Sequence, residues 1–281
     1  MFRRRKDSAP PLAGPDGSDW RSYDSVADVY ARVRVPVHEE PARDLIGVMA
    51  PGPGTRLLDV GTGPGVAAGP ALDAVGDSGL VVGVDLSPEM ARLARAAGVH
   101  VAVAAAIDLP FRDGTFDAVA SAFVLHLVPK YETTLFDMVR VLRPGGRLGL
   151  ATWVAGHDEF TTTWREVAES FATKEMLTDA LRRAAPWAEQ FSDPARIREI
   201  LRDAGVRDVR TERHGYRTSS SIQDYLAGRE TTVIGRFLRQ MLGETLWERF
   251  RQRVDEAFRE RFRDPIGDSN DVLLTVGTRD R

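Results

Sequence analysis

RLLDVGTGPGV, residues Arg56 to Val66, is the stretch that decides the fold of this chain. Its first half is a short apolar run, which is typical of a strand buried on both faces. Three glycines at alternate positions follow, so the backbone there can take positive φ and no side chain blocks an approaching ligand. The residues from Val66 to Ala74 suit a helix, whose N-terminus favours a carboxylate or phosphate. We therefore expect a strand, a tight turn and a helix that form one edge of a binding site.

Apolar runs alternate with helix-like segments from Thr55 to Trp153. This alternation predicts an α/β fold with a doubly wound, mostly parallel sheet, in which ligands bind at the carboxyl ends of the strands. Helices are expected to begin near Val66, Ser87 and Tyr131. The seven expected strands are Arg56–Val60, Leu80–Asp85, Val99–Ala104, Phe116–Ala122, Arg147–Trp153, Val206–Thr211 and Val272–Val276.

The second expected strand ends in Asp85, whose carboxylate can accept two hydrogen bonds from a ribose diol. Ser87 is a suitable N-cap for the next helix, and Met90 would face back toward the glycine turn. This layout fits two nucleotides, NAD and S-adenosylmethionine. The NAD fingerprint needs glycine or alanine three residues after its second glycine, and Val66 at that place argues against a pyrophosphate.

Composition excludes several classes of function. A net charge of -3 over 281 residues gives no electrostatic reason to expect a nucleic acid or an anionic membrane as partner. No segment is long and apolar enough to span a bilayer. There is no cysteine, so disulfides and thiolate metal sites are excluded. We expect no bound metal, since the five histidines are scattered: His38, His100, His126, His157 and His214.

The chain is expected to hold one domain behind a short lead. Residues 1–18 combine basic residues with proline and glycine, and predict a disordered start of a cytoplasmic protein. Residues 19–281 then form the domain, with cap helices at 20–49, a cofactor-binding core at 55–153 and lid insertions at about 157–190 and 221–264. The cap helices should break around Pro36 and Pro41. Tyr23 and Tyr30 share a helical face there, either as packing or as a cap over the ligand cleft.

Motifs in this chain resemble those of class I S-adenosylmethionine-dependent methyltransferases. They occur in the family's order and comprise Asp59–Gly65, Gly83–Met90, Leu109–Phe111, Gly114–Asp117 and Leu142–Leu148. The resemblance covers about Trp20 to Trp153 well and the remainder in outline. It is closest to the small-molecule branch that includes ubiquinone, menaquinone and natural-product methyltransferases. It implies a Rossmann-like methyltransferase fold whose last strand is antiparallel.

The resemblance also implies a set of residues that bind S-adenosyl-L-methionine. Asp59 would orient its ammonium group, and Asp85 would bind the ribose. Asp59 could instead only cap the turn, and Leu86 and Met90 could be ordinary core residues. The family commonly has an acidic residue where this chain has Ala105, so the adenine edge would be read by the backbone or by Asp108. The full set is Tyr23, Tyr30, Asp59, Gly61, Thr62, Gly63, Asp85, Leu86, Met90, Ala106, Ile107 and Ser121.

Two histidines are candidates for a catalytic base. His126 stands just after the fourth expected strand, where the family often has a histidine, and His157 follows the fifth. A base is needed only if the acceptor carries a proton of high pKa, because the sulfonium already activates the methyl group. Each histidine could instead be structural or bind the ligand.

The segments beyond Trp153 predict helices over the cleft. Their aromatic residues indicate a small, largely apolar acceptor; they are Phe160, Trp164, Phe171, Trp187, Tyr225 and Phe237. We expect an enzyme that methylates oxygen, carbon or nitrogen of such a metabolite. A protein of the same fold that binds the cofactor without transferring methyl, for ligand binding or cyclisation, is the first alternative. An NAD-dependent oxidoreductase is the second. The oligomeric state stays open, a homodimer included.

Overall fold

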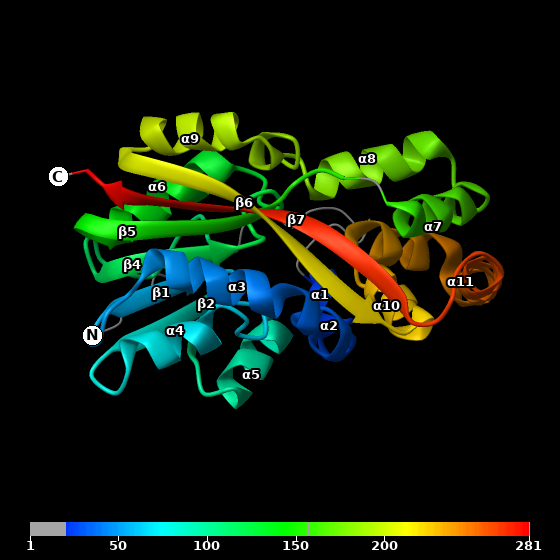
Figure 1. The fold of residues 1–281 in the computed structure, drawn as a ribbon, viewed down its shortest axis with the longest axis horizontal. Helices are drawn as coiled ribbons and strands as arrows, with labels where there is room; N and C mark the ends of the chain where they lie inside the picture. Colours follow the sequence, from blue (N-terminus) through cyan, green and yellow to red (C-terminus); the bar gives the residue numbers. More distant parts are fainter. Residues whose placement is uncertain (1–20, 157, 281) are drawn as a thin grey trace, which may run out of the picture.

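Seven strands form one sheet in the structure, a computed structural model that describes residues 21–156 and 158–280. The strand order is β3-β2-β1-β4-β5-β7-β6 (Figure 1). Strands β1 to β5 are parallel, while β7 is antiparallel to β5 and β6. The predicted doubly wound, mostly parallel sheet is confirmed. The strands are β1 (Arg56–Val60), β2 (Leu80–Asp85), β3 (His100–Val103), β4 (Phe116–Ala122), β5 (Leu142–Trp153), β6 (Val206–Ser220) and β7 (Ile266–Arg279).

Helices cover both faces of this sheet (Figure 1). Apolar residues of α3, α4 and α5 pack on one face, and those of α6 and α9 pack on the other. Burial of these two faces is the main source of stability. The helices are α1 (Arg21–Asp24), α2 (Ala27–Val33), α3 (Val35–Met49), α4 (Ala68–Val75), α5 (Pro88–Ala96), α6 (Tyr131–Val141), α7 (Glu159–Glu169), α8 (Lys174–Ala184), the 3-10 turn η1 (Gln190–Ser192), α9 (Pro194–Asp203), α10 (Ile222–Glu230) and α11 (Val233–Arg261).

Sequence signals for helix ends are mostly confirmed. The Ser87 hydroxyl accepts a hydrogen bond from the Met90 backbone N–H at 3.2 Å and caps α5. Of the breaks predicted around Pro36 and Pro41, the first is confirmed, because α2 gives way to α3 at Arg34 and Pro36 lies in the first turn of α3, where its missing N–H costs nothing. The break around Pro41 is wrong, because this proline lies inside α3. The lead at residues 1–18 lies outside the described residues.

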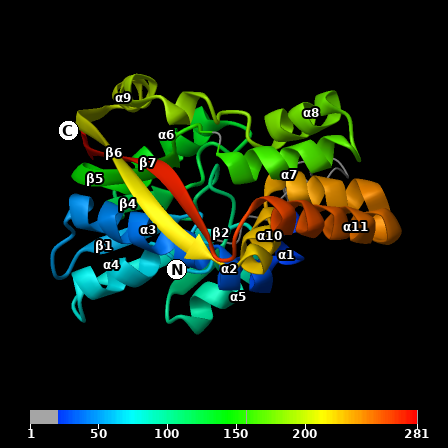
Figure 2. The same ribbon diagram turned by 45° about the vertical axis from the view of Figure 1, so that its right-hand side comes forward.

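Strands β6 and β7 extend well beyond their predicted ends. β7 pairs with β5 only over its second half, from Val272 to Thr278, whereas β6 and β7 pair with each other as far as Ser220 and Ile266. The extra length is therefore a two-stranded ribbon, which crosses from the sheet toward the remaining helices (Figures 1 and 2). Its residues are mostly polar and partly exposed, so they lack the apolar pattern that marks a buried strand.

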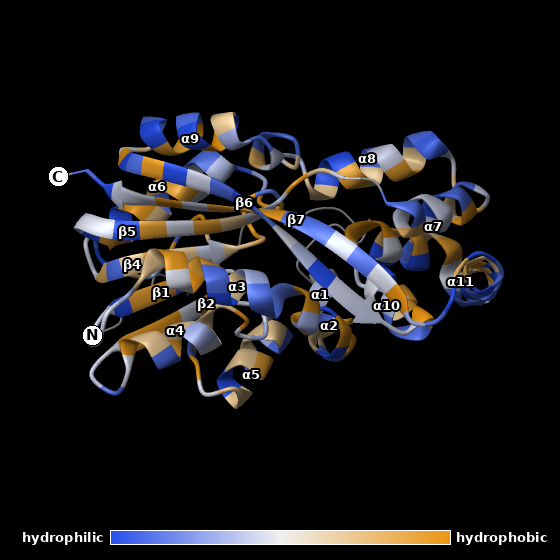
Figure 3. Ribbon diagram, in the orientation of Figure 1, coloured by the Kyte–Doolittle hydropathy of each residue, from blue (hydrophilic) through white to orange (hydrophobic). Residues whose placement is uncertain are grey.

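Helices α7, α8, α10 and α11 form a separate lid at the far end of the ribbon (Figure 2). They share an apolar core that includes Trp164, Trp247 and Phe250. The backbone of α11 kinks at Gly243, where φ is 65°. Beyond this kink Leu246 is 44% exposed and Trp247 is buried. Figure 3 shows the contrast between the apolar strands of the sheet and the hydrophilic outer turns of α11.

Candidate functional site

The glycine turn after β1 lies against the end of β2. The N–H groups of Gly61 and Thr62 both donate to the carbonyl of Val84, at 2.7 and 3.0 Å. Gly61 has φ of 74°, and a Cβ at this position would meet the Val124 side chain at 2.3 Å. Gly63 has φ of 52° and faces open space. Glycine is thus required at Gly61 by crowding, while Gly63 leaves the turn open to a ligand.

Asp85 closes β2 with its carboxylate beside this turn. One carboxylate oxygen accepts the Gly63 N–H at 2.8 Å and the other accepts the Ser87 N–H at 2.9 Å. Burial raises the pKa of Asp85, although these N–H donors act in the opposite direction. Each oxygen keeps a lone pair for a further donor. The carboxylate is therefore placed to accept hydrogen bonds from a diol.

Asp59 is a second carboxyl group at the same edge of the sheet. It is 1% exposed, and one of its oxygens accepts the Thr62 hydroxyl at 2.8 Å. Burial raises the pKa of Asp59 to about 7, and the nearby charge of Asp85 acts in the same direction. No cation lies within ion-pair distance of either carboxylate among residues 21–156 and 158–280. The pair therefore favours a ligand that brings hydroxyl donors and a positive charge.

Both carboxyl groups line a cavity of about 210 Å³, which we call the core cavity. Ten of the twelve cofactor residues expected from the sequence line it: Tyr23, Tyr30, Asp59, Gly61, Thr62, Gly63, Asp85, Leu86, Met90 and Ala106. The other two lie elsewhere. Ile107 is 36% exposed, and the buried Ser121 hydroxyl donates to the Val60 carbonyl at 2.9 Å, which ties β4 to β1.

An aromatic cluster closes one end of the core cavity, and the sequence reasoning missed it. His38, 4% exposed, stacks on Tyr30 and meets Phe123 and Trp153 edge-on. Phe123 stacks on Trp153 with ring centroids 4.2 Å apart, and its φ of 63° is unusual for a non-glycine residue. Tyr30, Arg34 and His38 are spaced four residues apart, which is the one sequence signal that could have indicated a shared face.

The ring of His38 is fixed in one orientation. Its Nδ1 lies 2.5 Å from the Arg34 carbonyl, so this nitrogen must carry the proton and donate. Burial lowers the pKa of His38 to about 3, and the charge of Arg34 acts in the same direction. His38 is therefore neutral at ordinary pH, with Nε2 as its acceptor atom.

Of the two histidines proposed from the sequence, only His126 lies within the described residues, and its charge acts to lower the pKa of His38. His126 does not line the core cavity, and burial lowers its pKa to about 4. Its carbonyl accepts the Trp187 N–H at 3.4 Å, which ties the end of β4 to the segment before η1. His157 lies outside the described residues.

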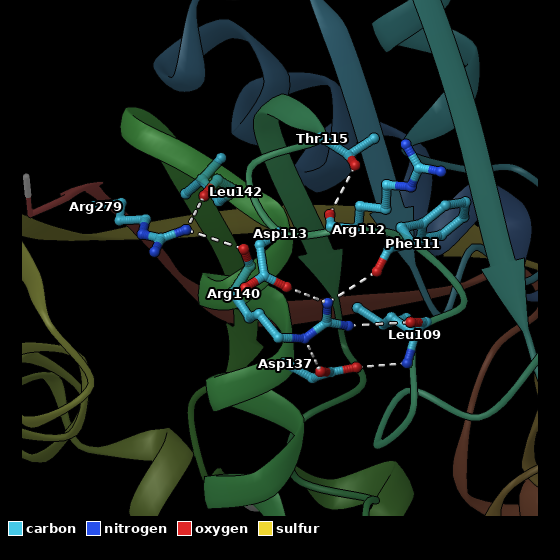
Figure 4. Close-up of polar contacts among 9 residues, drawn as sticks. All are labelled: Leu109, Phe111, Arg112, Asp113, Thr115, Asp137, Arg140, Leu142 and Arg279. Carbon is cyan, nitrogen blue, oxygen red and sulfur yellow. Dashed lines mark hydrogen bonds and ion pairs between the residues drawn. The ribbon is translucent and has the colours of Figure 1, made fainter.

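The loop between β3 and β4, which carries Ala106 into the cavity wall, is held by one arginine of α6 (Figure 4). The guanidinium of Arg140 donates to the carbonyls of Phe111 and Leu109, at 2.8 and 3.1 Å. It also contacts the carboxylates of Asp137 and Asp113, at 2.6 and 2.8 Å. The family motifs in this loop are thus structural, because they position the wall of the cavity.

The aromatic residues expected above the acceptor pack mainly with one another. Phe160, Trp164, Phe171 and Phe237 belong to the lid core, and Trp187 packs beside the sheet. Tyr225 is the one of the six that lines the cavity between lid and ribbon, as far as the described residues show. The expected apolar roof is therefore absent from this part of the structure.

Comparisons with known proteins agree with the geometry. A family model described as a methyltransferase domain matches residues 58–150. Nocamycin O-methyltransferase of Saccharothrix syringae is 31% identical over 205 residues, which cover 67% of this chain and 72% of that protein. Demethylmenaquinone methyltransferase of Lactococcus lactis is 30% identical over 178 residues, which cover 58% of this chain and 69% of that protein.

A solved structure extends the likeness to nearly the whole fold. The cyclase SpnF aligns with a TM-score of 0.56 at 18% sequence identity, over 97% of this chain and 100% of that chain. At this identity the likeness concerns the fold alone. No helix among the described residues combines the length and apolar character needed to cross a membrane. Within the same residues, no group of three or more histidine, aspartate or glutamate side chains could hold a metal ion.

Proposed function

Because this chain belongs to the S-adenosylmethionine-dependent methyltransferase family, we propose that it transfers the methyl group of that cofactor to a small metabolite. The observation that carries the proposal is the pair of carboxyl groups, Asp59 and Asp85, that line the core cavity with no cation in ion-pair range among the residues that the structure describes. A sugar diol and an amino-acid ammonium group are the partners that such a pair requires.

The residues of the core cavity fit this cofactor. Asp85 keeps lone pairs for the ribose, and Gly63 leaves open space for the amino-acid portion beside Asp59. Leu86 and Met90 provide apolar surface for the adenine. When bound, the cofactor supplies a methyl group that its sulfonium already activates. The task of the chain is then to hold the acceptor in line and to exclude water.

His38 is the side chain that we assign to the acceptor at this end of the cavity. Its Nδ1–H is held by Arg34, which leaves Nε2 to accept a hydrogen bond from a hydroxyl, amide or enol group. The low pKa of His38 favours a role in orientation over proton abstraction. We retain His126 and His157 as candidates for a base that acts once an acceptor has bound.

A second candidate function is cofactor binding without methyl transfer, as a platform for ligand binding or cyclisation. The stacked pair of Phe123 and Trp153 supports it, because Phe123 lines the core cavity while Trp153 lines the cavity beneath the lid. This pair separates the two spaces. Methyl transfer requires that the partition opens when an acceptor binds.

Calorimetry with S-adenosylhomocysteine tests the cofactor assignment. We expect D85A to weaken binding at least about 30-fold, since the ribose hydroxyls lose their acceptor. The matched control is D73A, which removes an exposed carboxylate on α4. Unchanged affinity in D85A, or no binding by the wild type, would overturn the proposal.

Incubation with methyl-labelled cofactor and a metabolite extract separates the two functions. Labelled product supports methyl transfer. Tight cofactor binding with no labelled product from any fraction of the extract supports the platform function instead.

A further inference from the structure

A second and larger cavity lies between the lid and the ribbon, and we call it the lid cavity. Its volume is about 700 Å³. The α2–α3 junction, β6, β7, α7 and α10 all contribute to its wall, and these elements come together beside the lid in Figures 1 and 2. Most of its lining side chains are polar or charged, including four arginines: Arg32, Arg34, Arg217 and Arg229.

Arg229 is the member of this set whose surroundings are hardest to explain by folding alone. Its Nε atom is buried and has no hydrogen-bond partner among the described residues. Its guanidinium lies over the ring of Trp164, 4.9 Å from the centroid. Burial lowers the pKa of Arg229 and the charge of Arg34 acts in the same direction, while Tyr225, Asp158 and Asp268 act in the opposite direction from beyond ion-pair distance. An unpaired buried cation is costly, and an anionic ligand would offset that cost.

Arg34 places a second positive charge beside the first. Its Cδ lies 3.5 Å from the position that a Cβ on Gly228 would take, so α10 passes close to the stem of this arginine. No carboxylate lies within ion-pair distance of the Arg34 side chain in the part of the chain that the structure describes. Two adjacent arginines without carboxylate partners form a site for a negatively charged group.

The acidic residues of the lid cavity have other partners. Asp158 caps α7 by accepting the Thr161 N–H at 2.5 Å and the Thr161 hydroxyl at 3.0 Å. Asp224 forms an ion pair with Arg32. One oxygen of Asp268 accepts the Asn270 side-chain amide at 3.0 Å, and its other oxygen is buried without a partner. That last oxygen is available to a donor group on a ligand.

Trp153 places the lid cavity next to the end of the core cavity that the aromatic cluster closes. It lines the lid cavity and stacks on Phe123, which lines the core cavity. A molecule held by Arg34 and Arg229 could therefore extend toward the partition with its reacting atom foremost. This geometry suits an acceptor that is anchored at one end and methylated at the other.

We propose that the lid cavity binds the methyl acceptor as an anion, through Arg229 and Arg34, so that the acceptor is a small organic acid or acidic enol. The proposal rests on the proposed function and names its substrate class. It replaces the largely apolar acceptor that the sequence led us to expect.

Binding of benzoate, compared with the neutral isostere benzamide, tests the anion site without any turnover. We expect calorimetry to detect benzoate and to give at least about tenfold weaker binding for benzamide. R229Q and R34Q should each weaken benzoate at least about tenfold, whereas R229K should retain part of the affinity. R249Q, an exposed arginine of α11 outside the lid cavity, is the matched control. Equal binding of benzoate and benzamide, or of benzoate to wild type and R229Q, would refute the site.

Turnover gives the second readout. A metabolite extract is divided by an anion-exchange resin into a retained acidic fraction and a neutral flow-through, and each is incubated with labelled cofactor. We expect label from the acidic fraction, a loss of at least tenfold in R229Q, and unchanged cofactor affinity in that variant. Label from the neutral fraction alone contradicts the anionic acceptor while leaving methyl transfer intact. No label from either fraction, with benzoate still bound, contradicts methyl transfer while leaving the anion site intact.

Discussion

Arg140 and Arg229 are both placed by helices against the interior, and they differ in what surrounds the guanidinium. Arg140 contacts two carboxylates and two carbonyls of the loop before β4 (Figure 4). Arg229 lies over an indole ring and has a buried Nε with no partner among the described residues. A guanidinium that donates from all three of its nitrogens, as that of Arg140 does, fixes the backbone around it. A buried guanidinium with an unused donor carries a desolvation cost that an anionic ligand would offset.

The two cavities also differ in which of their charged groups lack a partner. Around the core cavity, motif residues hold one another, and the carboxyl groups of Asp59 and Asp85 have no countercharge within residues 21–156 and 158–280. Around the lid cavity, Arg34 and Arg229 have no carboxylate within ion-pair distance among the described residues, whereas Arg32 pairs with Asp224 and one oxygen of Asp268 has no partner there. In our proposal, the core cavity thus offers hydrogen-bond acceptors to the cofactor and the lid cavity offers donors to the substrate.

The largest expected effect is on stability, at Arg140. Its side chain is 23% exposed and that of Asp137 is 11% exposed, so R140A removes the cation beside a largely buried carboxylate, which keeps the Leu109 N–H as a donor, and it also removes the donor to the Phe111 carbonyl. We expect the free energy of unfolding to fall by about 3 kcal/mol, measured by urea denaturation. R143A breaks a more exposed pair with Asp117 and should cost less than about 1 kcal/mol. Equal losses in the two variants would show that Arg140 is an ordinary surface arginine.

The next effect extends the comparison to a buried acid, Asp59. Its pKa of about 7 in the free protein means that the carboxylate needed by the cofactor ammonium forms only near neutrality. Affinity for S-adenosylhomocysteine should therefore fall up to about tenfold per pH unit below pH 7, as measured by calorimetry. D59N should bind weakly at every pH, without this slope.

The contribution of Asp59 to the unfolding free energy of the free protein changes with pH in the opposite direction to the cofactor affinity. The pKa of Asp59 is raised above its unfolded value, so the neutral form is the one that the fold favours. Its contribution to stability is full below pH 3.8 and is lost as the pH rises toward 7. The difference in unfolding free energy between wild type and D59N should follow this trend. A difference that does not change with pH would contradict the assignment.

The smallest effect distinguishes the two arginines most sharply, because we expect it to have the opposite sign. R229M removes an unpaired buried charge and keeps an unbranched side chain over Trp164, where a thioether can contact the ring. The free energy of unfolding should rise by about 1 kcal/mol, although benzoate binding is lost. R140M should instead lose about as much stability as R140A. Destabilisation by R229M would indicate that Arg229 holds the lid together.

The parts of the fold that the sequence predicted well are those whose environment is local in the chain. β2 and β4 have their predicted bounds because a strand buried by helices on both faces is an apolar run. The β6–β7 ribbon was predicted only in part, because its outer half is polar and is defined by pairing between distant residues. The break predicted around Pro36 occurs at Arg34, whereas the one around Pro41 is absent because α3 accommodates this proline.

In the candidate site too, residues within a local motif could be predicted and residues brought together from distant parts of the chain could not. The glycine turn and Asp85 could be predicted, because a short motif contains both the backbone geometry and the carboxylate. His38 could not, since its neighbours Phe123 and Trp153 are far away in the sequence. Arg229 lies in a segment rich in arginine and glutamate, and this composition predicts a helix face that is exposed to solvent. Only the packing of α10 on the ribbon makes this one arginine an inward charge.

The position of the lid helices in the chain has a consequence for how new specificities arise. Ser220 and Ile266 are paired across the ribbon, so α10 and α11 leave and rejoin the sheet at neighbouring residues. A foreign segment of any length whose ends meet at the same spacing can replace them without changing the register of a single strand. The end of the ribbon is therefore a position at which inserted segments can be exchanged, and such exchange can redirect this fold to new substrates in nature or in the laboratory.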